Sequence, residues 1–169
     1  DIPTGETRFL CALEADNSDN RSNDGRADPQ GGFWIGTMDK HERIPNGAIY
    51  RYYRGELRKL YSNIAIPNAI SFAPDGKTAC FADTVQGLVW RVGLDVDGWP
   101  NVKREVYIDF RPMGLNPDGA VFDAAGLFWC AHWGAGCIAA YDAGGKQVAR
   151  HEVPARHSSC PAFGGPDFT

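Results

Sequence analysis

The stretch DGAVFDAAGLFWCAHW at residues 118–133 decides the fold, because two other stretches of the chain follow the same plan. These are NDGRADPQGGFWIGTM at residues 23–38 and NAISFAPDGKTACFAD at residues 68–83. Each begins with Asn or Asp, carries a glycine eight residues later, and ends in an apolar run that is typical of a strand. The chain therefore repeats with a period near fifty residues, and such a period indicates a solenoid, a propeller or another array.

A second hairpin follows each of these stretches. In the first hairpin the glycine falls in the predicted turn, most plainly in Pro-Asp-Gly at residues 74–76. We expect third strands at residues 47–53, 88–94 and 137–142, and fourth strands at residues 57–61, 106–110 and 147–153. Four strands per fifty residues are typical of a propeller blade. The alternative is a β-sandwich with coincidental spacing.

The number of repeats predicts an incomplete ring. Three repeats are too few to close a propeller, whose blades usually number four to eight, although a partial fourth repeat is expected to start at residues 159–165. We therefore expect residues 1–169 to form one partial propeller domain, all-β, with an N-terminal blade and the C-terminal remainder absent.

Composition excludes several classes of function. The 169 residues include 20 glycines and 11 prolines, a density that favours many short strands and turns. A net charge of -4 provides no basic surface for nucleic acid or an anionic membrane. No apolar run is long enough to span a bilayer, and the first residues lack the layout of a secretory signal. The five cysteines show no CxxC spacing, which argues against a disulfide framework or structural zinc and favours a cytoplasmic location.

The residues that begin the three stretches are the strongest candidates for a site. In a propeller the first strand of each blade lines the central channel, so Asn23, Asn68 and Asp118 are expected to converge there. Carboxylate and amide oxygens suit Ca²⁺, Mg²⁺ or Mn²⁺. Pro67 and Pro117 precede two of these residues and restrict the local backbone. Taken singly, each of the three is also an ordinary turn residue.

Arg21 is expected to join this group, because residues i and i+2 of a strand share one face. Its guanidinium could donate several hydrogen bonds to substrate oxygens, although a solvated surface charge is the alternative. The four histidines lack the spacing of a zinc site, and Trp129 and Trp133 are expected to pack between blades, away from the channel.

Five motifs together resemble the senescence-marker-protein, gluconolactonase and luciferin-regenerating-enzyme family, the regucalcin-like sugar lactonases. They lie at residues 21–25, 36–38, 67–68, 117–119 and 160–165. The resemblance implies a six-bladed propeller of nearly twice this length with one divalent metal in its channel. It assigns Asn68 and Asp118 as metal ligands, together with a glutamate in a blade before residue 1.

The same resemblance implies substrate-orienting roles for Arg21 and Asn23. His41 falls where some relatives carry a glutamate that touches substrate, which puts that contact in doubt. The implied activity is hydrolysis of a sugar (aldono-) lactone, with a metal-polarised carbonyl, an activated water and Asp118 as general base. Ca²⁺ is the expected ion, with Zn²⁺, Mn²⁺ or Mg²⁺ as alternatives, and no other cofactor is needed.

Two other functions stay open. One is a non-catalytic propeller that binds calcium or a partner protein, and the other is a propeller that acts on different esters or phosphoesters. The sequence predicts a small-molecule sugar lactone as the partner, with no nucleic acid and no membrane, and leaves the particular lactone and the oligomeric state open.

Overall fold

The computed structural model describes residues 2–42 and 44–166. In this part of the chain twelve strands form three four-stranded antiparallel sheets. The first sheet holds β1 (Asn20–Ala27), β2 (Phe33–Asp39), β3 (Gly47–Tyr53) and β4 (Glu56–Ile64). The second holds β5 (Pro67–Phe72), β6 (Thr78–Asp83), β7 (Leu88–Gly93) and β8 (Glu105–Asp109). The third holds β9 (Asn116–Phe122), β10 (Phe128–Trp133), β11 (Cys137–Tyr141) and β12 (Gln147–Glu152).

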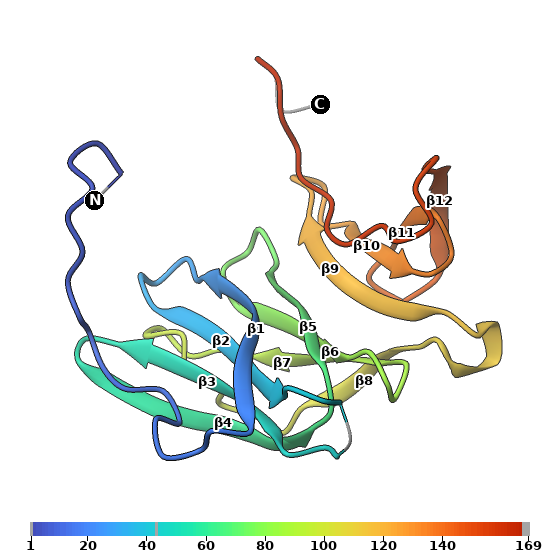
Figure 1. The fold of residues 1–169 in the computed structure, drawn as a ribbon. Coiled ribbons are helices and arrows are strands. Elements are labelled where there is room, and N and C mark those ends of the chain that lie inside the picture. The colour runs from blue at the N-terminus through green and yellow to red at the C-terminus, as the bar shows by residue number, and fades with distance from the viewer. Residues whose placement is uncertain (1, 43, 167–169) are drawn as a thin grey trace.

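Strand order in every sheet is the order of the chain, from β1 to β4, from β5 to β8 and from β9 to β12. Figure 1 shows the three sheets following one another, and β5 packs between β1 and β9. The first strands are thus the inner ones, and each sheet is a blade of a β-propeller. The predicted all-β propeller fold is confirmed, and we call the sheets the first, second and third blades.

The predicted strands agree with the structure to within a few residues at their ends. The last predicted repeat is different, because residues 157–166 contain no strand among the described positions. This segment nevertheless lies beside β9, since the Gly119 N–H donates to the Ser159 carbonyl at 2.7 Å. Within the described residues the only helix is a single 3₁₀ turn, Arg111–Met113, so no helix is long and apolar enough to cross a membrane.

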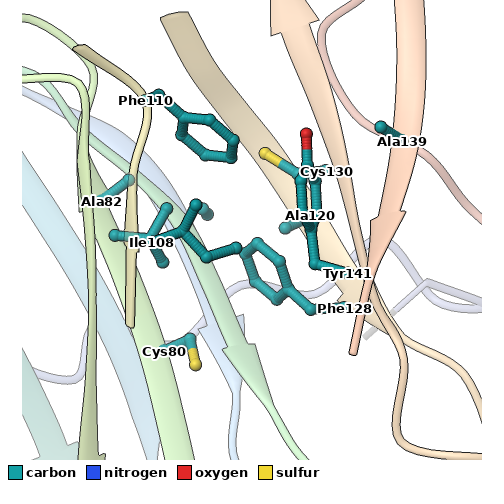
Figure 2. Packing of buried hydrophobic residues seen from close by; sticks show 11 residues of the cluster. Cys80, Ala82, Ile108, Phe110, Ala120, Phe128, Cys130, Ala139 and Tyr141 are labelled. Atoms are coloured by element: carbon teal, nitrogen blue, oxygen red, sulfur yellow. The ribbon is translucent and has the colours of Figure 1, made fainter. Parts of the chain in front are cut away.

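Two apolar clusters join the blades. Trp34, Ile70 and Phe81 belong to the cluster between the first and second blades, and all three are fully buried. Figure 2 shows the cluster between the second and third blades, where Phe110 and Phe128 are completely buried. Truncating a buried Phe to Ala usually costs about 3–5 kcal/mol, so the contacts between blades hold the inner strands in place.

An irregularity interrupts the first strand of every blade at the same level. Residues 23–24 lie opposite Gly36, residues 69–70 opposite Phe81, and residues 118–119 opposite Ala131. Such a bulge places two residues against one and re-aims side chains next to functional sites. The extra residue of β5 is accompanied by a left-handed backbone at Ala69, with a φ of 55°. These bulges interrupt the ladder at Asn23, at Asp118 and directly after Asn68, so they lie at the beginnings of the three predicted stretches.

Asn68 stands one residue out of step with Asn23 and Asp118, contrary to the equivalence that the spacing predicts. Asn68 pairs with the fifth residue of β6, Ala82. The fifth residues of β2 and β10 pair instead with Ser22 and Pro117, which precede Asn23 and Asp118. The cause is the turn after β5, which is one residue longer than the turns after β1 and β9, because the Ala73 N–H bonds to the carbonyl five residues on and the other two turns close over four. A count of residues to the turn glycine hides this difference.

Candidate active site

One pocket of about 620 Å³ lies at the level of the bulges. The four residues singled out from the sequence, Arg21, Asn23, Asn68 and Asp118, all line it. The other lining residues are Asp24, Met38, Glu42, Ile66, Thr84, Gly119, Trp133, Ser159 and Cys160. All three blades and the segment after β12 therefore contribute to one wall, as a propeller channel requires.

A chain of hydrogen bonds crosses the pocket from blade to blade. The Nδ2 group of Asn23 donates to the Oδ1 atom of Asn68 at 2.9 Å and to the Pro67 carbonyl at 3.0 Å. The Nδ2 group of Asn68 donates to the Oγ1 atom of Thr84 at 2.8 Å. Thr84 in turn donates to the Pro117 carbonyl at 2.7 Å. This chain fixes the amide of Asn68, whose Oδ1 atom keeps a second lone pair for another partner.

Arg21 and Asn23 lie on the same face of β1, as the spacing predicts. An Nη1 hydrogen of Arg21 reaches the Oδ1 atom of Asn23 at 2.9 Å and the Ser22 carbonyl at 3.0 Å. Arg21 is exposed, and a guanidinium carries five donors. Several of its N–H groups therefore remain for a ligand in the pocket.

Asp118 and Asp24 form a pair of half-buried carboxyl groups. Burial raises the pKa of Asp118 to about 6, and the negative charge of Asp24 adds to this rise. Burial also raises the pKa of Asp24, although its Oδ2 atom accepts the Ile70 N–H at 2.8 Å. A carboxylate whose charge is poorly compensated by its own protein favours a cation or a proton as its partner. Asp24 lies next to Asn23 in the sequence, but only the fold reveals its proximity to Asp118.

Arg26 connects the inner strands of the three blades. Its Nε group donates to the Ile70 carbonyl at 2.8 Å, and its Nη2 group donates to the Ala120 carbonyl at 3.1 Å. The Arg26 side chain thus joins β1 to β5 and β9. A separate cavity of about 410 Å³ lies beyond it, lined by Arg26 and by Phe163.

Glu42 and Trp133 line the pocket, although the sequence did not single out either residue for it. Glu42, rather than His41, lines the pocket, and His41 is exposed to solvent outside it. Trp133 is 44% exposed and also lines the pocket, so it does not pack between blades as expected. The expectation failed because Trp133 is the last residue of β10, where the strand leaves the inter-blade core.

The donor set suits a hard divalent cation. The described residues contain no group of three or more His, Cys, Asp or Glu that could hold a metal. Asn68 and Asp118 nevertheless offer an amide oxygen and a carboxylate on one pocket wall, which are ligands that Ca²⁺ and Mg²⁺ accept. The raised pKa of Asp118 is consistent with a site built for a positive partner. These two residues fit the metal implied by the resemblance.

An inner-strand channel lined by Arg, Asn and Asp side chains defines a propeller with an oxygen-rich polar site. The sequence matches the family described as the SMP-30/Gluconolactonase/LRE-like region over residues 1–169. The chain therefore belongs to the SMP-30/gluconolactonase/LRE-like family.

Individual relatives agree with this assignment. A provisionally named sugar lactone lactonase of Rhizobium meliloti is 48% identical over 98% of this chain and 56% of its own length. Pentonolactonase XacC of Haloferax volcanii is 33% identical over 90% of this chain and 52% of its own length. The crystal structure of a calcium-binding protein, regucalcin, from Agrobacterium tumefaciens is 44% identical, with a TM-score of 0.95 over 99% of this chain and 57% of that one. The chain thus spans little more than half the length of these relatives.

Proposed function

We propose that this chain supplies the substrate- and metal-binding wall of a hydrolase that opens sugar (aldono-) lactones. The observation that carries the proposal is the convergence of Arg21, Asn23, Asn68 and Asp118 on one pocket. Lactonases among the relatives support the reaction class. An aldonolactone presents a ring ester and several hydroxyl groups, and the pocket offers donors and acceptors for both.

Asn68 and Asp118 are the proposed holders of one divalent cation, with Ca²⁺ as the first choice. When bound, such an ion supplies polarisation of the ester carbonyl and stabilisation of the negative charge that develops on its oxygen. The name of the Agrobacterium relative, a calcium-binding protein, supports this choice. The hydrogen bonds of Asn68 with Thr84 and Asn23 fix its amide, and the Oδ1 atom keeps a second lone pair for the ion.

Asp118 is the proposed general base. Asp118 is a half-buried carboxylate on the pocket wall, placed to take a proton from a water molecule that attacks the lactone carbonyl. Water attack on the carbonyl carbon forms the new C–O bond as one proton of the water passes to Asp118. Asp118 then returns this proton to the ring oxygen as the ring C–O bond breaks, which releases the open-chain acid. Arg21 and Asn23 orient the lactone by hydrogen bonds to its oxygens.

Hydrolysis assays test this proposal. Proton release from D-glucono-1,5-lactone, a xylonolactone and an arabinonolactone is measured on the full-length protein, with and without Ca²⁺ after chelation. Asp118→Asn is expected to lower kcat by about 100-fold or more, which is the usual range for loss of a general base. Asn68→Ala is expected to weaken Ca²⁺ binding and turnover together.

Asp75→Asn is the matched control, because Asp75 lies in the turn after β5 and does not line the pocket. This variant is expected to keep the wild-type rate. Wild-type rates in both Asp118→Asn and Asn68→Ala would contradict the proposal. Tight Ca²⁺ binding with no turnover of any lactone would instead support a non-catalytic calcium-binding propeller.

A further inference from the structure

Trp133 is the large aromatic residue on the wall of the candidate pocket. It ends β10 and pairs with Asn116 of β9, two residues before Asp118. It therefore lies at the same end of the third blade as the proposed base. An exposed tryptophan is unusual, because this side chain is highly buried on average, and 44% of Trp133 is exposed.

The indole ring of Trp133 is held in place from behind. The ring of His157 stacks on it with a centroid separation of 4.4 Å and an interplanar angle of 17°. A backbone bridge also joins Trp133 to His157, and the side chain of Asn116 donates to the Trp133 carbonyl at 3.4 Å. Because His157 covers one face, the exposed surface belongs to the opposite face and the edge. The ring is thus preorganised before any ligand arrives.

Most of the other residues that line the pocket have polar side chains. Arg21, Asn23 and Asp118 can interact with oxygen atoms of a ligand. A lactone ring also has C–H bonds on its faces. The face of an indole carries negative charge density and attracts hydrogens that bear partial positive charge. A ligand pocket that combines an aromatic surface with a few placed polar groups can both hold a ring and fix its orientation.

We propose that Trp133, backed by His157, is the platform on which the C–H face of the lactone ring packs, so that Trp133 determines specificity for ring-shaped polyol esters. The inference rests on the proposed function for the class of its substrate. Trp133 takes no part in bond making. It selects a ligand that has a polar edge for Arg21 and Asn23 and an apolar face for the indole.

A second tryptophan on the same strand provides a matched comparison. Trp129 of β10 also stacks on a histidine, His151, with centroids 5.6 Å apart and an angle of 20°. Trp129 does not line the pocket, however, and its Nε1 group donates to Asp123. His151 and His157 are both exposed. His151→Ala therefore removes an equivalent stack without touching the pocket.

Steady-state kinetics of variants and binding of a non-hydrolysable ring test whether Trp133 is the platform. On the full-length protein, Trp133→Ala is expected to raise KM for D-glucono-1,5-lactone roughly tenfold while kcat changes less than about threefold, since the contact serves binding in the ground and transition states alike. Trp133→Phe is expected to restore KM to within about threefold, because a flat ring remains. His157→Ala is expected to raise KM, and His151→Ala is expected to leave it unchanged.

A second experiment uses D-glucono-1,5-lactam, a ring that resists hydrolysis. Its binding to residues 1–169 is measured by calorimetry and by the NMR resonance of the Trp133 indole N–H group. Lactam binding that shifts this resonance and is lost in Trp133→Ala supports the platform even where turnover is absent. An unchanged KM and an unchanged lactam affinity in Trp133→Ala, with active wild-type protein, would overturn the platform and leave the proposed function intact. Wild-type protein that neither hydrolyses the lactone nor binds the lactam would overturn both.

Discussion

The amide nitrogen of Asn23 lies 2.9 Å from the amide oxygen of Asn68, and this hydrogen bond joins the first strands of two neighbouring blades. A proposed substrate contact and a proposed metal ligand are therefore coupled directly. Asn23 also holds the Pro67 carbonyl, immediately before Asn68. A change at Asn23 is therefore expected to disturb the proposed metal ligand Asn68 as well as the contact with substrate.

Asn23→Ala is accordingly expected to weaken Ca²⁺ binding, although Asn23 is not itself a proposed ligand. Loss of a hydrogen bond worth about 0.5–1.5 kcal/mol corresponds to roughly a 2- to 10-fold loss of affinity. Calorimetric titration with Ca²⁺ measures this loss of affinity. Arg21→Ala is the control, since Arg21 contacts Asn23 but not Asn68, and equal loss of Ca²⁺ affinity in both variants would contradict the coupling.

Thr84 connects Asn68 to the third blade through two hydrogen bonds. Thr84→Val keeps the shape of the side chain but leaves the Asn68 Nδ2 group and the Pro117 carbonyl without this partner. We expect a loss of about 1–3 kcal/mol in the free energy of unfolding, as is usual for unsatisfied polar groups. Urea denaturation measures this loss. Thr84→Ser retains the hydroxyl and is expected to lose much less, so similar losses in the two variants would contradict the stabilising role of the hydroxyl hydrogen bonds.

A buried ion pair within the first blade holds Arg51, which in turn contacts the second blade. The Nε group of Arg51 lies 2.6 Å from the Oδ2 atom of Asp28, and both side chains are fully buried. Arg51 also donates to the Asp97 carbonyl at 2.7 Å, and its guanidinium lies 4.4 Å from the centroid of the Trp99 ring.

Asp28→Asn is expected to destabilise the fold by about 3–5 kcal/mol, because it leaves the Arg51 charge buried without its partner. Thermal or urea unfolding provides the measurement. The exposed pair of Arg150 and Glu152 serves as the comparison. Glu152→Gln is expected to change stability by no more than about 1 kcal/mol. A loss of that small size in Asp28→Asn would show that the pair contributes little to the fold.

His132 predicts a pH-dependent stability. Its ring is completely buried, bonds to the Tyr141 hydroxyl at 2.8 Å and packs against Phe110. Burial lowers the pKa of His132 to about 4, with a smaller contribution from the positive charge of Arg150. The unfolded state therefore binds more protons than the folded state between about pH 6.5 and pH 4, so stability rises with pH across this window.

The contribution of His132 should be fully present above about pH 6.5 and lost as the pH falls towards 4, amounting to roughly 3 kcal/mol at most. Urea unfolding of the wild type and of His132→Gln across this range checks the prediction. The slope of stability against pH should be smaller in His132→Gln. Identical slopes in the two proteins would assign the effect to other groups.

The repeats made the blades predictable because each hairpin carries local signals in its turn residues and apolar runs. The site was predictable only in part. Asn68 lines the expected pocket although its register differs from that of Asn23 and Asp118, and a difference of one residue in turn length does not alter the glycine spacing. The bulges leave no local signal in the sequence either.

Contacts between blades were beyond the reach of the sequence. The effect of Asp24 on Asp118 and the bridge made by Thr84 depend on how separate blades pack together, and the exposure of Trp133 depends on where β10 ends. Each of these residues has an ordinary local environment when its own strand is considered alone. The spacing of residues within one repeat therefore contains no information about them.

The bulges have a consequence for how such a site can change over evolutionary time. At the bulges of the second and third blades an extra residue turns its N–H group to a partner outside its own sheet, as Ile70 bonds to Asp24 and Gly119 bonds to Ser159. A side chain at this level can be exchanged without shifting the register of the remaining strands. A lineage can therefore alter the chemistry at the channel mouth while it inherits the pairing of every blade unchanged.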